Sequence, residues 1–159
     1  MHENDPRMNY WLMKSEPDTF GIDHLIARPQ QTEPWDGVRN YQARNMMRDG
    51  MQVGDKAFFY HSNCAEPGIV GIVQIVKAGY PDSTALDPES KYYDPKASKD
   101  NPRWFRVDVK FEKKFDRTVT LSALKQQPQL DGMAVLARGS RLSITPVTPA
   151  QWHFILGLT

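Results

Sequence analysis

The stretch that decides the class of fold is FRVDVKFE, residues 105–112. Its apolar side chains Phe105, Val107, Val109 and Phe111 alternate with charged ones. A period of two is the repeat of a β-strand, because successive side chains of a strand point to opposite faces. The alternation therefore predicts a strand with one face in the core and the other in water.

Four more segments have the composition of strands. Residues 10–13, 56–61, 69–76 and 142–144 are rich in aromatic or β-branched side chains, which favour strands. Residues 69–76 are almost entirely apolar, which is typical of a strand in the middle of a closed sheet. The chain is thus expected to contain several short strands separated by turns.

Helical signals are confined to short segments. We expect a short helix within residues 20–26 and a second over residues 41–48, which follow Asn40, a good N-cap residue. Thr148 and Gln151 form a capping box that predicts a helix at the C-terminal end. Strands with a few helices predict the α+β class, here a small mixed β-barrel with flanking short helices.

The composition is that of an ordinary folded domain. The chain has 159 residues, of which 40% are hydrophobic and 25% charged, so a disordered or fibrous protein is not favoured. We expect residues 1–8 to be a loose N-terminal leader and residues 9–159 a single domain. Because apolar stretches stay well short of the roughly 18 residues that cross a bilayer, and the single Cys64 suits a reducing compartment, a cytoplasmic protein without membrane contact is expected.

Residues 80–103 form an unusually long polar stretch with four prolines, yet they include Tyr92 and Tyr93. Loops of this length inside a compact domain are uncommon and often functional. We expect this segment to cover a site.

Trp35 is the aromatic residue that most suggests a binding role. It lies in EPWDG, residues 33–37, which has the composition of a turn. An indole has little reason to be buried in a turn unless it lines a pocket, and aromatic side chains at loop edges stack on nucleobases. Packing in the core is the alternative for the aromatic residues on strands.

The net charge of +1 gives no general attraction to phosphate polymers, so nucleic-acid binding would need a local patch. Arg39 and Arg44 near the predicted second helix, and Arg138 with Arg141 around Gly139, could form such patches. The planar fork of arginine suits phosphate. A solvated charged face is the alternative.

Enzymatic motifs are not evident. His61 and Cys64 are three residues apart and would be half a zinc site, but no second Cys/His pair follows, so a metal is not expected. A Walker A sequence, a nucleophile elbow and a G-x-G-x-x-G motif are all missing from the sequence. No cofactor is expected.

Several motifs resemble those of the EVE domain family, a branch of the PUA-like superfamily related to YTH domains. The matching stretches are YWLMKSEP (residues 10–17), WDGVRNYQARN (35–45), FYHSN (59–63), SKYYD (90–94), PRWF (102–105) and RGSRLS (138–143). The resemblance implies a compact barrel with a pocket for a modified nucleobase in nucleic acid, DNA or RNA. Function is carried over at the level of the pocket only.

The resemblance also assigns residues by position. Trp35 would form one aromatic wall, and Tyr92, Tyr93 or Trp104 the opposing one. The pocket would further contain Lys14, Ser15, Asp36, Asn40, His61, Ser62 and Asn63. Phosphate contacts would come from Arg39, Arg44, Arg138 and Arg141.

The implied partner is nucleic acid that carries a modified base, and a nuclease or modification enzyme is the expected protein partner. Two alternatives to a non-catalytic module stay open. Some PUA-like relatives are small amidohydrolases acting on modified nucleosides, and Lys14 with Glu16 could serve as base and acid. An aromatic groove could instead hold a peptide.

Overall fold

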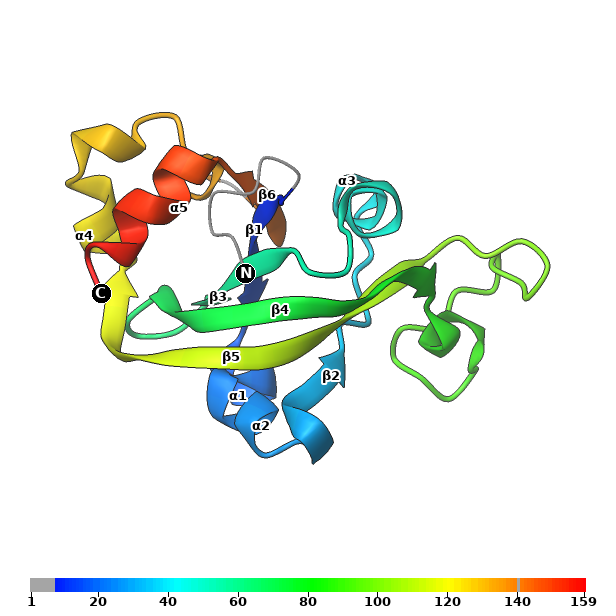
Figure 1. Ribbon diagram of the computed structural model, residues 1–159. Helices are drawn as coiled ribbons and strands as arrows, with labels where there is room; N and C mark the ends of the chain where they lie inside the picture. The colour runs from blue at the N-terminus through cyan, green and yellow to red at the C-terminus, as the bar shows by residue number, and fades with distance from the viewer. Residues whose placement is uncertain (1–7, 140) are drawn as a thin grey trace.

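Six strands form one mixed sheet in the order β2-β5-β4-β3-β1-β6. The computed structural model describes residues 8–139 and 141–159. β1 and β3 run parallel and the other neighbouring strands antiparallel. The longest strands, β4 and β5, run side by side across the molecule (Figure 1). The strands are β1 (Tyr10–Ser15), β2 (Thr32–Pro34), β3 (Lys56–His61), β4 (Gly68–Pro81), β5 (Phe105–Thr120) and β6 (Ile144–Val147).

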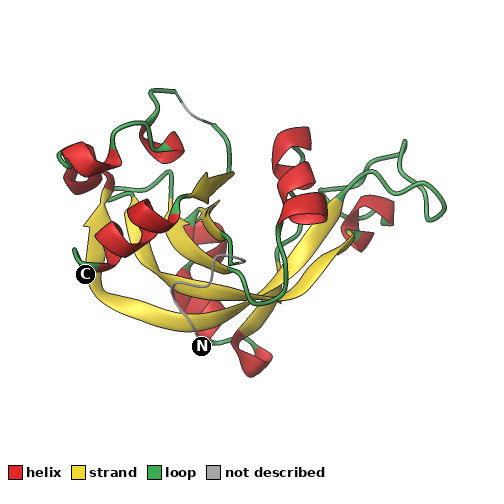
Figure 2. Cartoon of the chain, turned by 45° about the horizontal axis from the view of Figure 1, so that its top comes forward, coloured by secondary structure: helices red, strands yellow, loops and turns green. Residues whose placement is uncertain are grey.

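Short helices flank this sheet (Figure 2). The α-helices are α1 (Pro17–Phe20), α2 (Ile22–Ile26), α3 (Tyr41–Asn45), α4 (Leu121–Lys125) and α5 (Pro149–Leu156). A π-helical turn, Met46–Gly50, continues α3, and 3-10 turns occupy Pro29–Gln31, Ser83–Leu86, Pro128–Leu130 and Ala134–Leu136. Figure 1 shows α4 and α5 together at one end of the molecule, and α1 with α2 beside β5. Among the described residues, no helix is long and apolar enough to span a membrane.

The middle of the sheet is buried on both faces. Along β1, Trp11 and Met13 join one apolar cluster, whereas Tyr10 and Leu12 join a second cluster. Because adjacent side chains of a strand point to opposite faces, the two clusters lie on opposite sides of β1. β3 divides its side chains in the same way. Burial on both faces explains why β1 and β3 have continuous apolar sequences, whereas β5 alternates.

The predicted α+β class is confirmed, but the sheet does not close into the predicted small mixed β-barrel. β2 is hydrogen-bonded only to β5 and β6 only to β1 in the described sheet, so the two edges do not join. Both edge strands are short. The seam between them is occupied by side chains that line a large cavity, which is described below.

Most predicted elements are present, although their limits differ. The predicted strands over 69–76 and 105–112 are parts of the longer β4 and β5, whose pairing is interrupted by register shifts. The helix predicted over 41–48 is α3 followed by the π-helical turn, and the strand predicted at 142–144 begins at Ile144. β2 was not predicted.

Both predicted caps are confirmed. The Asn40 side chain accepts a hydrogen bond from the Ala43 N–H at 3.0 Å. Thr148 and Gln151 exchange the two hydrogen bonds of a capping box. Of the leader predicted over residues 1–8, Met8 alone lies within the described residues, and it packs against the second apolar cluster.

Candidate functional site

A cavity of about 1220 Å³ opens at the seam between the two edges of the sheet. Its walls come from the end of β1, from α1, from Arg28 and β2 with the turn after it, from the turn after β3, from the long segment between β4 and β5, and from the residues before β6. They are Lys14, Ser15, Glu16, Thr19, Phe20, Arg28, Glu33, Pro34, Trp35, Asp36, Gly37, Val38, Arg39, Ser62, Asn63, Lys91, Tyr92, Arg141 and Ser143.

Trp35 has two structural roles. It lines the cavity, and it also belongs to the core, where its ring lies edge-on to Phe59 with the centroids 5.5 Å apart. The side chain is 8% exposed. Its backbone N–H donates to the Val107 carbonyl at 2.7 Å, which extends the pairing of β2 with β5 past Pro34. Trp35 is therefore a rigid wall, held from behind by the core.

Two carboxylates lie at the turn after Trp35: Asp36 belongs to the turn, and Asp82 contacts it from the long segment between β4 and β5. Asp36 lines the cavity, and burial raises its pKa, with a further increase from the nearby Asp82. Arg106 lies 3.5 Å from the Asp36 carboxylate and opposes this effect. Asp36 thus keeps a partly desolvated carboxyl group at the cavity wall, where it can accept a hydrogen bond from a ligand amine.

Asp82 fastens the long segment to this turn. Its buried carboxylate accepts hydrogen bonds from the backbone N–H groups of Gly37 and Thr84, both at 2.9 Å, and from the Thr84 hydroxyl at 2.6 Å. Burial alone would raise the pKa of Asp82, but these hydrogen bonds outweigh it and hold the pKa below its usual range. Of residues 80–103, which are expected to cover a site, Lys91 and Tyr92 line the cavity.

Tyr92 is packed against the same turn. Gly37 has a φ of +77°, and a Cβ atom at this position would overlap the Tyr92 ring. Glycine is therefore required for both the backbone conformation and the close contact.

Arg39 is committed to the protein rather than free for phosphate. Its guanidinium donates to the Tyr92 and Val38 carbonyls, to Asp82 and to the Thr84 hydroxyl. These bonds engage the five donors that an arginine has. The predicted phosphate contact from Arg39 is not favoured by this geometry, although the side chain does line the cavity.

Polar groups from β1 and the turn after β3 form another wall. Burial lowers the pKa of the Lys14 ammonium, which lies 5.8 Å from the centre of the Tyr60 ring. The Ser15 hydroxyl donates to the Phe20 carbonyl at 2.6 Å. Asn63 adopts a φ of +52°, a conformation that asparagine tolerates, and its amide donates to Glu16 at 3.3 Å.

The cavity brings together a large part of the predicted site. Its walls include Lys14, Ser15, Trp35, Asp36, Arg39, Ser62, Asn63, Tyr92 and Arg141. Sequence reasoning did not identify Thr19, Phe20, Arg28, Glu33, Pro34, Gly37, Val38, Lys91 and Ser143. Several of these flank predicted residues, but no periodic or motif signal marks them. The structural role of Asp82 was also missed, although Asp-Ser-Thr after a proline is a typical turn composition.

Other predicted pocket residues lie outside the cavity walls. The Asn40 side chain is used as the cap of α3. His61 accepts the Ile22 N–H at 3.1 Å and packs edge-on against Phe59, and burial lowers its pKa. The side chains of Asn40 and His61 are therefore explained by structural roles, without a role in the cavity.

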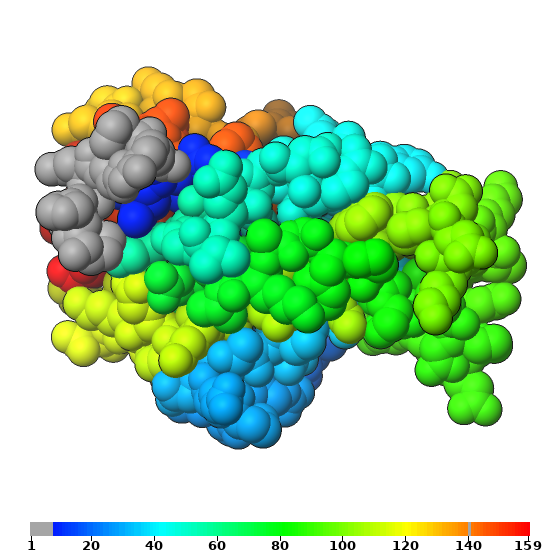
Figure 3. Space-filling view, turned by 45° about the vertical axis from the view of Figure 1, so that its right-hand side comes forward, coloured from blue at the N-terminus to red at the C-terminus, as the bar shows by residue number. Residues whose placement is uncertain are grey.

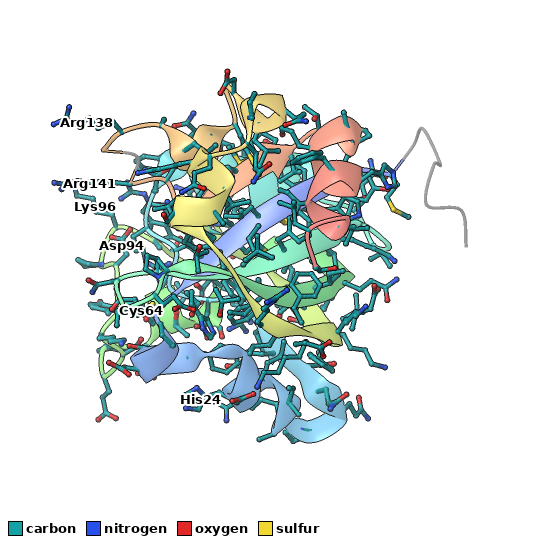
Figure 4. All side chains as sticks on the ribbon, turned by 90° about the vertical axis from the view of Figure 1, so that its left-hand side faces the viewer. His24, Cys64, Asp94, Lys96, Arg138 and Arg141 are labelled. Carbon is teal, nitrogen blue, oxygen red and sulfur yellow. The ribbon has the colours of Figure 1, made fainter. Side chains whose placement is uncertain are left out.

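Trp104 and Arg44 belong to a separate aromatic cluster, and Tyr93 is exposed. Arg138 is exposed in the loop before β6, on the same side of the molecule as Arg141 and Lys96 (Figure 4). Base or phosphate contacts by these residues stay predictions.

A metal site is not evident in the part of the chain that the structure describes. Residues 8–139 and 141–159 contain no group of three or more His, Cys, Asp or Glu side chains that could hold a metal ion.

The chain belongs to the EVE domain family, which it matches over residues 9–158, and the mixed six-stranded sheet with a few short helices is consistent with the PUA-like fold of that family. Thymocyte nuclear protein 1 of Danio rerio is 47% identical over 170 residues, covering 96% of this chain and 73% of that protein. The human thymocyte nuclear protein 1, in a crystal structure in complex with DNA containing 5-methylcytosine, has a TM-score of 0.88 at 46% identity, covering 94% of this chain and 96% of that one. A crystal structure of a Pseudomonas putida protein has a TM-score of 0.88 at 53% identity, covering 94% and 98% of the two chains.

Proposed function

We propose that this chain binds DNA by holding a modified cytosine base in the cavity at the sheet seam, without chemical change to the base. The observation that carries the proposal is the cavity wall formed by Trp35 and Asp36, an aromatic surface beside a carboxylate. The human relative crystallised with 5-methylcytosine DNA supports the choice of base.

The wall suits the chemistry of cytosine. The ring can stack on Trp35, and the exocyclic N4 amine can donate to the Asp36 carboxylate, a pairing that proteins use to recognise cytosine. The Lys14 ammonium can donate to a ring acceptor, O2 or N3. Phe20, Pro34 and Val38 provide apolar surface in the same cavity for a methyl group.

The cavity is larger than a base requires. Pockets for drug-sized ligands are roughly 300–1,000 Å³, so a volume of about 1220 Å³ leaves room for the sugar and phosphate of the same nucleotide. Lys91, Arg141 and Arg28 line it and are exposed, but Arg28 is ion-paired with Glu33 at 3.1 Å. Lys91 and Arg141 are therefore the cations best placed for phosphate. A duplex would have to flip the base out, at a cost of a few kcal/mol, so single-stranded or mismatched sites should bind more tightly.

Thymine in the same sequence context is the sharpest probe of this proposal. It has the shape and methyl group of 5-methylcytosine but presents the O4 acceptor where cytosine has its amine. Fluorescence anisotropy with otherwise identical single strands should therefore show weaker binding of thymine, by about 5- to 150-fold for a loss of roughly 1–3 kcal/mol. Unmodified cytosine should bind about fourfold more weakly than 5-methylcytosine, as expected for one methyl group worth roughly 0.8 kcal/mol.

The variant Asp36→Asn identifies the group responsible. An amide can donate to O4, so the preference for 5-methylcytosine over thymine should shrink or reverse. Asp116→Asn, at an exposed position on β5, is the matched control and should leave the preference intact. Equal binding of the two bases by the parent protein would contradict the proposal. Titration with RNA strands of the same sequence tests whether the protein binds DNA or RNA more tightly.

An amidohydrolase-like activity is the second candidate, since Lys14 and Glu16 both line the cavity. Incubation with free acylated and methylated nucleosides, followed by mass spectrometry, tests it directly. Saturable binding without product supports the binding module. A nuclease or modification enzyme is the proposed protein partner, because a net charge of +1 supplies little affinity for DNA on its own.

A further inference from the structure

A stacked aromatic pair lies outside the cavity. Tyr41, the first residue of α3, packs on Trp104 with the ring centres 4.8 Å apart and the planes 21° from parallel. Trp104 is 7% exposed, and its indole N–H donates to Asp94 at 2.7 Å. Tyr41 is 48% exposed. The inner ring is thus fixed, and the outer ring is presented to solvent.

Two guanidinium groups lie at the rim of this pair. Arg44 is 4.6 Å from the centre of the Tyr41 ring and 6.0 Å from that of Trp104. Arg103 is 5.8 and 6.0 Å from the same two centres. A group over the far face of Tyr41 would be much more distant from Trp104 than these values. Both arginines therefore flank the stack and leave the far face of Tyr41 uncovered by their side chains.

The cations are oriented by contacts within the cluster. Arg44 donates to neutral acceptors, the Asn45 side chain and the Arg103 carbonyl, and these bonds do not cancel its charge. Arg103 donates to the Tyr41 hydroxyl and lies 3.5 Å from Asp94. In Figure 3 the cyan surface of α3 lies directly against the yellow-green surface of the segment that precedes β5. The result is an exposed ring with positive charge at its edge.

This cluster is continuous with the cavity. The Arg39 guanidinium, which lines the cavity, lies 5.2 Å from the Trp104 ring and donates to the carbonyl of Tyr92, another cavity wall. The Arg39 side chain therefore lies between the cavity and the Tyr41–Trp104 pair. Successive nucleotides of one strand rise about 3.4 Å in duplex DNA and lie further apart in an extended single strand, so a strand with one base in the cavity can reach the Tyr41 ring within a few nucleotides.

We propose that the far face of Tyr41 stacks an unpaired nucleobase of the same strand, a few nucleotides from the base in the cavity, while Arg44 and Arg103 contact its phosphates. The inference rests on the proposed function, since the cavity supplies the anchor. Stacking accepts any base because every base has a π-face, and flanking cations suit the backbone. The cavity selects the modified base, and the Tyr41 ring adds affinity without sequence preference.

The test combines ring variants with abasic strands. Tyr41→Ala removes the ring, Tyr41→Phe keeps it as a control, and Tyr41→Leu keeps apolar cover over Trp104 if the alanine variant folds poorly. Each is titrated by anisotropy with a labelled nine-nucleotide single strand that has a central 5-methylcytosine. Further strands replace each neighbouring nucleotide in turn with an abasic one, and free 5-methyl-2′-deoxycytidine tests the cavity alone.

Tyr41→Ala and Tyr41→Leu should weaken binding of the intact strand by about 5- to 150-fold, the range for loss of one stacked base. Tyr41→Phe keeps the ring and loses only the hydroxyl to which Arg103 donates, so its loss should be much smaller than that of Tyr41→Ala. All variants should bind the free nucleoside equally. The loss should vanish with the strand that lacks the stacked base. The proposal is overturned if the Tyr41 variants bind the intact strand with unchanged affinity. It is also overturned if the loss of affinity persists with every abasic strand, which is the result that a peptide-binding or purely structural role would give.

Failure of the proposed function is visible separately. If the parent does not distinguish 5-methylcytosine from thymine, the cavity assignment fails, and the abasic series on an unmodified strand still decides whether Tyr41 stacks a base. A parent protein that binds no strand at all overturns both.

Discussion

Replacement of Trp35 by alanine separates the two roles of this side chain. The residue is 8% exposed and packs against Phe59, so truncation removes a core contact and leaves a void. Truncation of a buried tryptophan destabilises a protein by about 3–5 kcal/mol. One face of Trp35 already borders the cavity, so we expect a value near the lower end, about 3 kcal/mol. From the sequence alone, Trp35→Ala would be expected to weaken binding more than folding. The burial of Trp35 indicates that folding stability is lost as well.

The same variant should also lose its stacking surface. The folded protein should bind a 5-methylcytosine strand about 5- to 150-fold more weakly, for a loss of roughly 1–3 kcal/mol. Urea denaturation gives the free energy of unfolding, and anisotropy, corrected for the folded fraction, gives the affinity. Domains are typically stable by about 5–15 kcal/mol, so enough folded protein remains to measure both.

Trp152→Ala is the matched control. Trp152 is 2% exposed and stacks on Tyr10 and Phe58 in the second apolar cluster, away from the cavity walls. It should lose comparable stability, yet its folded fraction should bind DNA normally. If the folded Trp35→Ala protein also binds with the parent affinity, Trp35 is a core residue only and the stacking argument fails.

Three further outcomes are expected. Asp82 has a lowered pKa in the folded state, so its contribution to stability is complete above the ordinary pKa of aspartate and is lost as the pH falls through the folded-state pKa. The free energy of unfolding of Asp82→Asn should therefore vary less with pH in the acid range than that of the parent. Parallel curves of unfolding free energy against pH for the two proteins would contradict the hydrogen-bond argument. Gly37→Ala forces a positive φ on alanine and overlaps the Tyr92 ring, so thermal melting should show a loss of at least about 1–2 kcal/mol, together with weaker binding of the 5-methylcytosine strand. Thr148→Ala removes the cap of α5 and should lower stability by about 0.5–2 kcal/mol in urea denaturation with no change in DNA affinity; a change in affinity would show that α5 communicates with the cavity.

Local signals in the sequence predicted the elements better than their limits. The alternation of residues 105–112 marks β5 because that part of the strand has one wet face. The rest of β5 lacks a clear alternation, because among residues 113–120 Phe115 and Val119 alone are buried. β2 has three residues and ends in Pro34, so it shows no period; its pairing with β5 makes it a strand.

The candidate site was predictable where residue type and local context agree. Trp35 and Asp36 lie in a turn, and both line the cavity. His61 and Trp104 have equally suggestive side chains, but long-range partners hold them elsewhere, Ile22 for His61 and Tyr41 for Trp104. Such partners are distant in sequence, so a motif does not show which way a side chain points.

The gap between β2 and β6 has a consequence for how this family can change its ligand. Glu33 pairs with Val109 and the Ser143 carbonyl accepts the Lys14 N–H, but each has a backbone partner on one side only, so side-chain substitutions at Glu33 or Ser143 alter the cavity wall while the central strands keep their hydrogen bonds. A closed barrel would confine such changes to inward side chains packed against one another, where volume changes are costly. The open seam therefore allows selection to alter recognition and stability almost independently. We expect relatives with different base preferences to differ mainly at these edge positions.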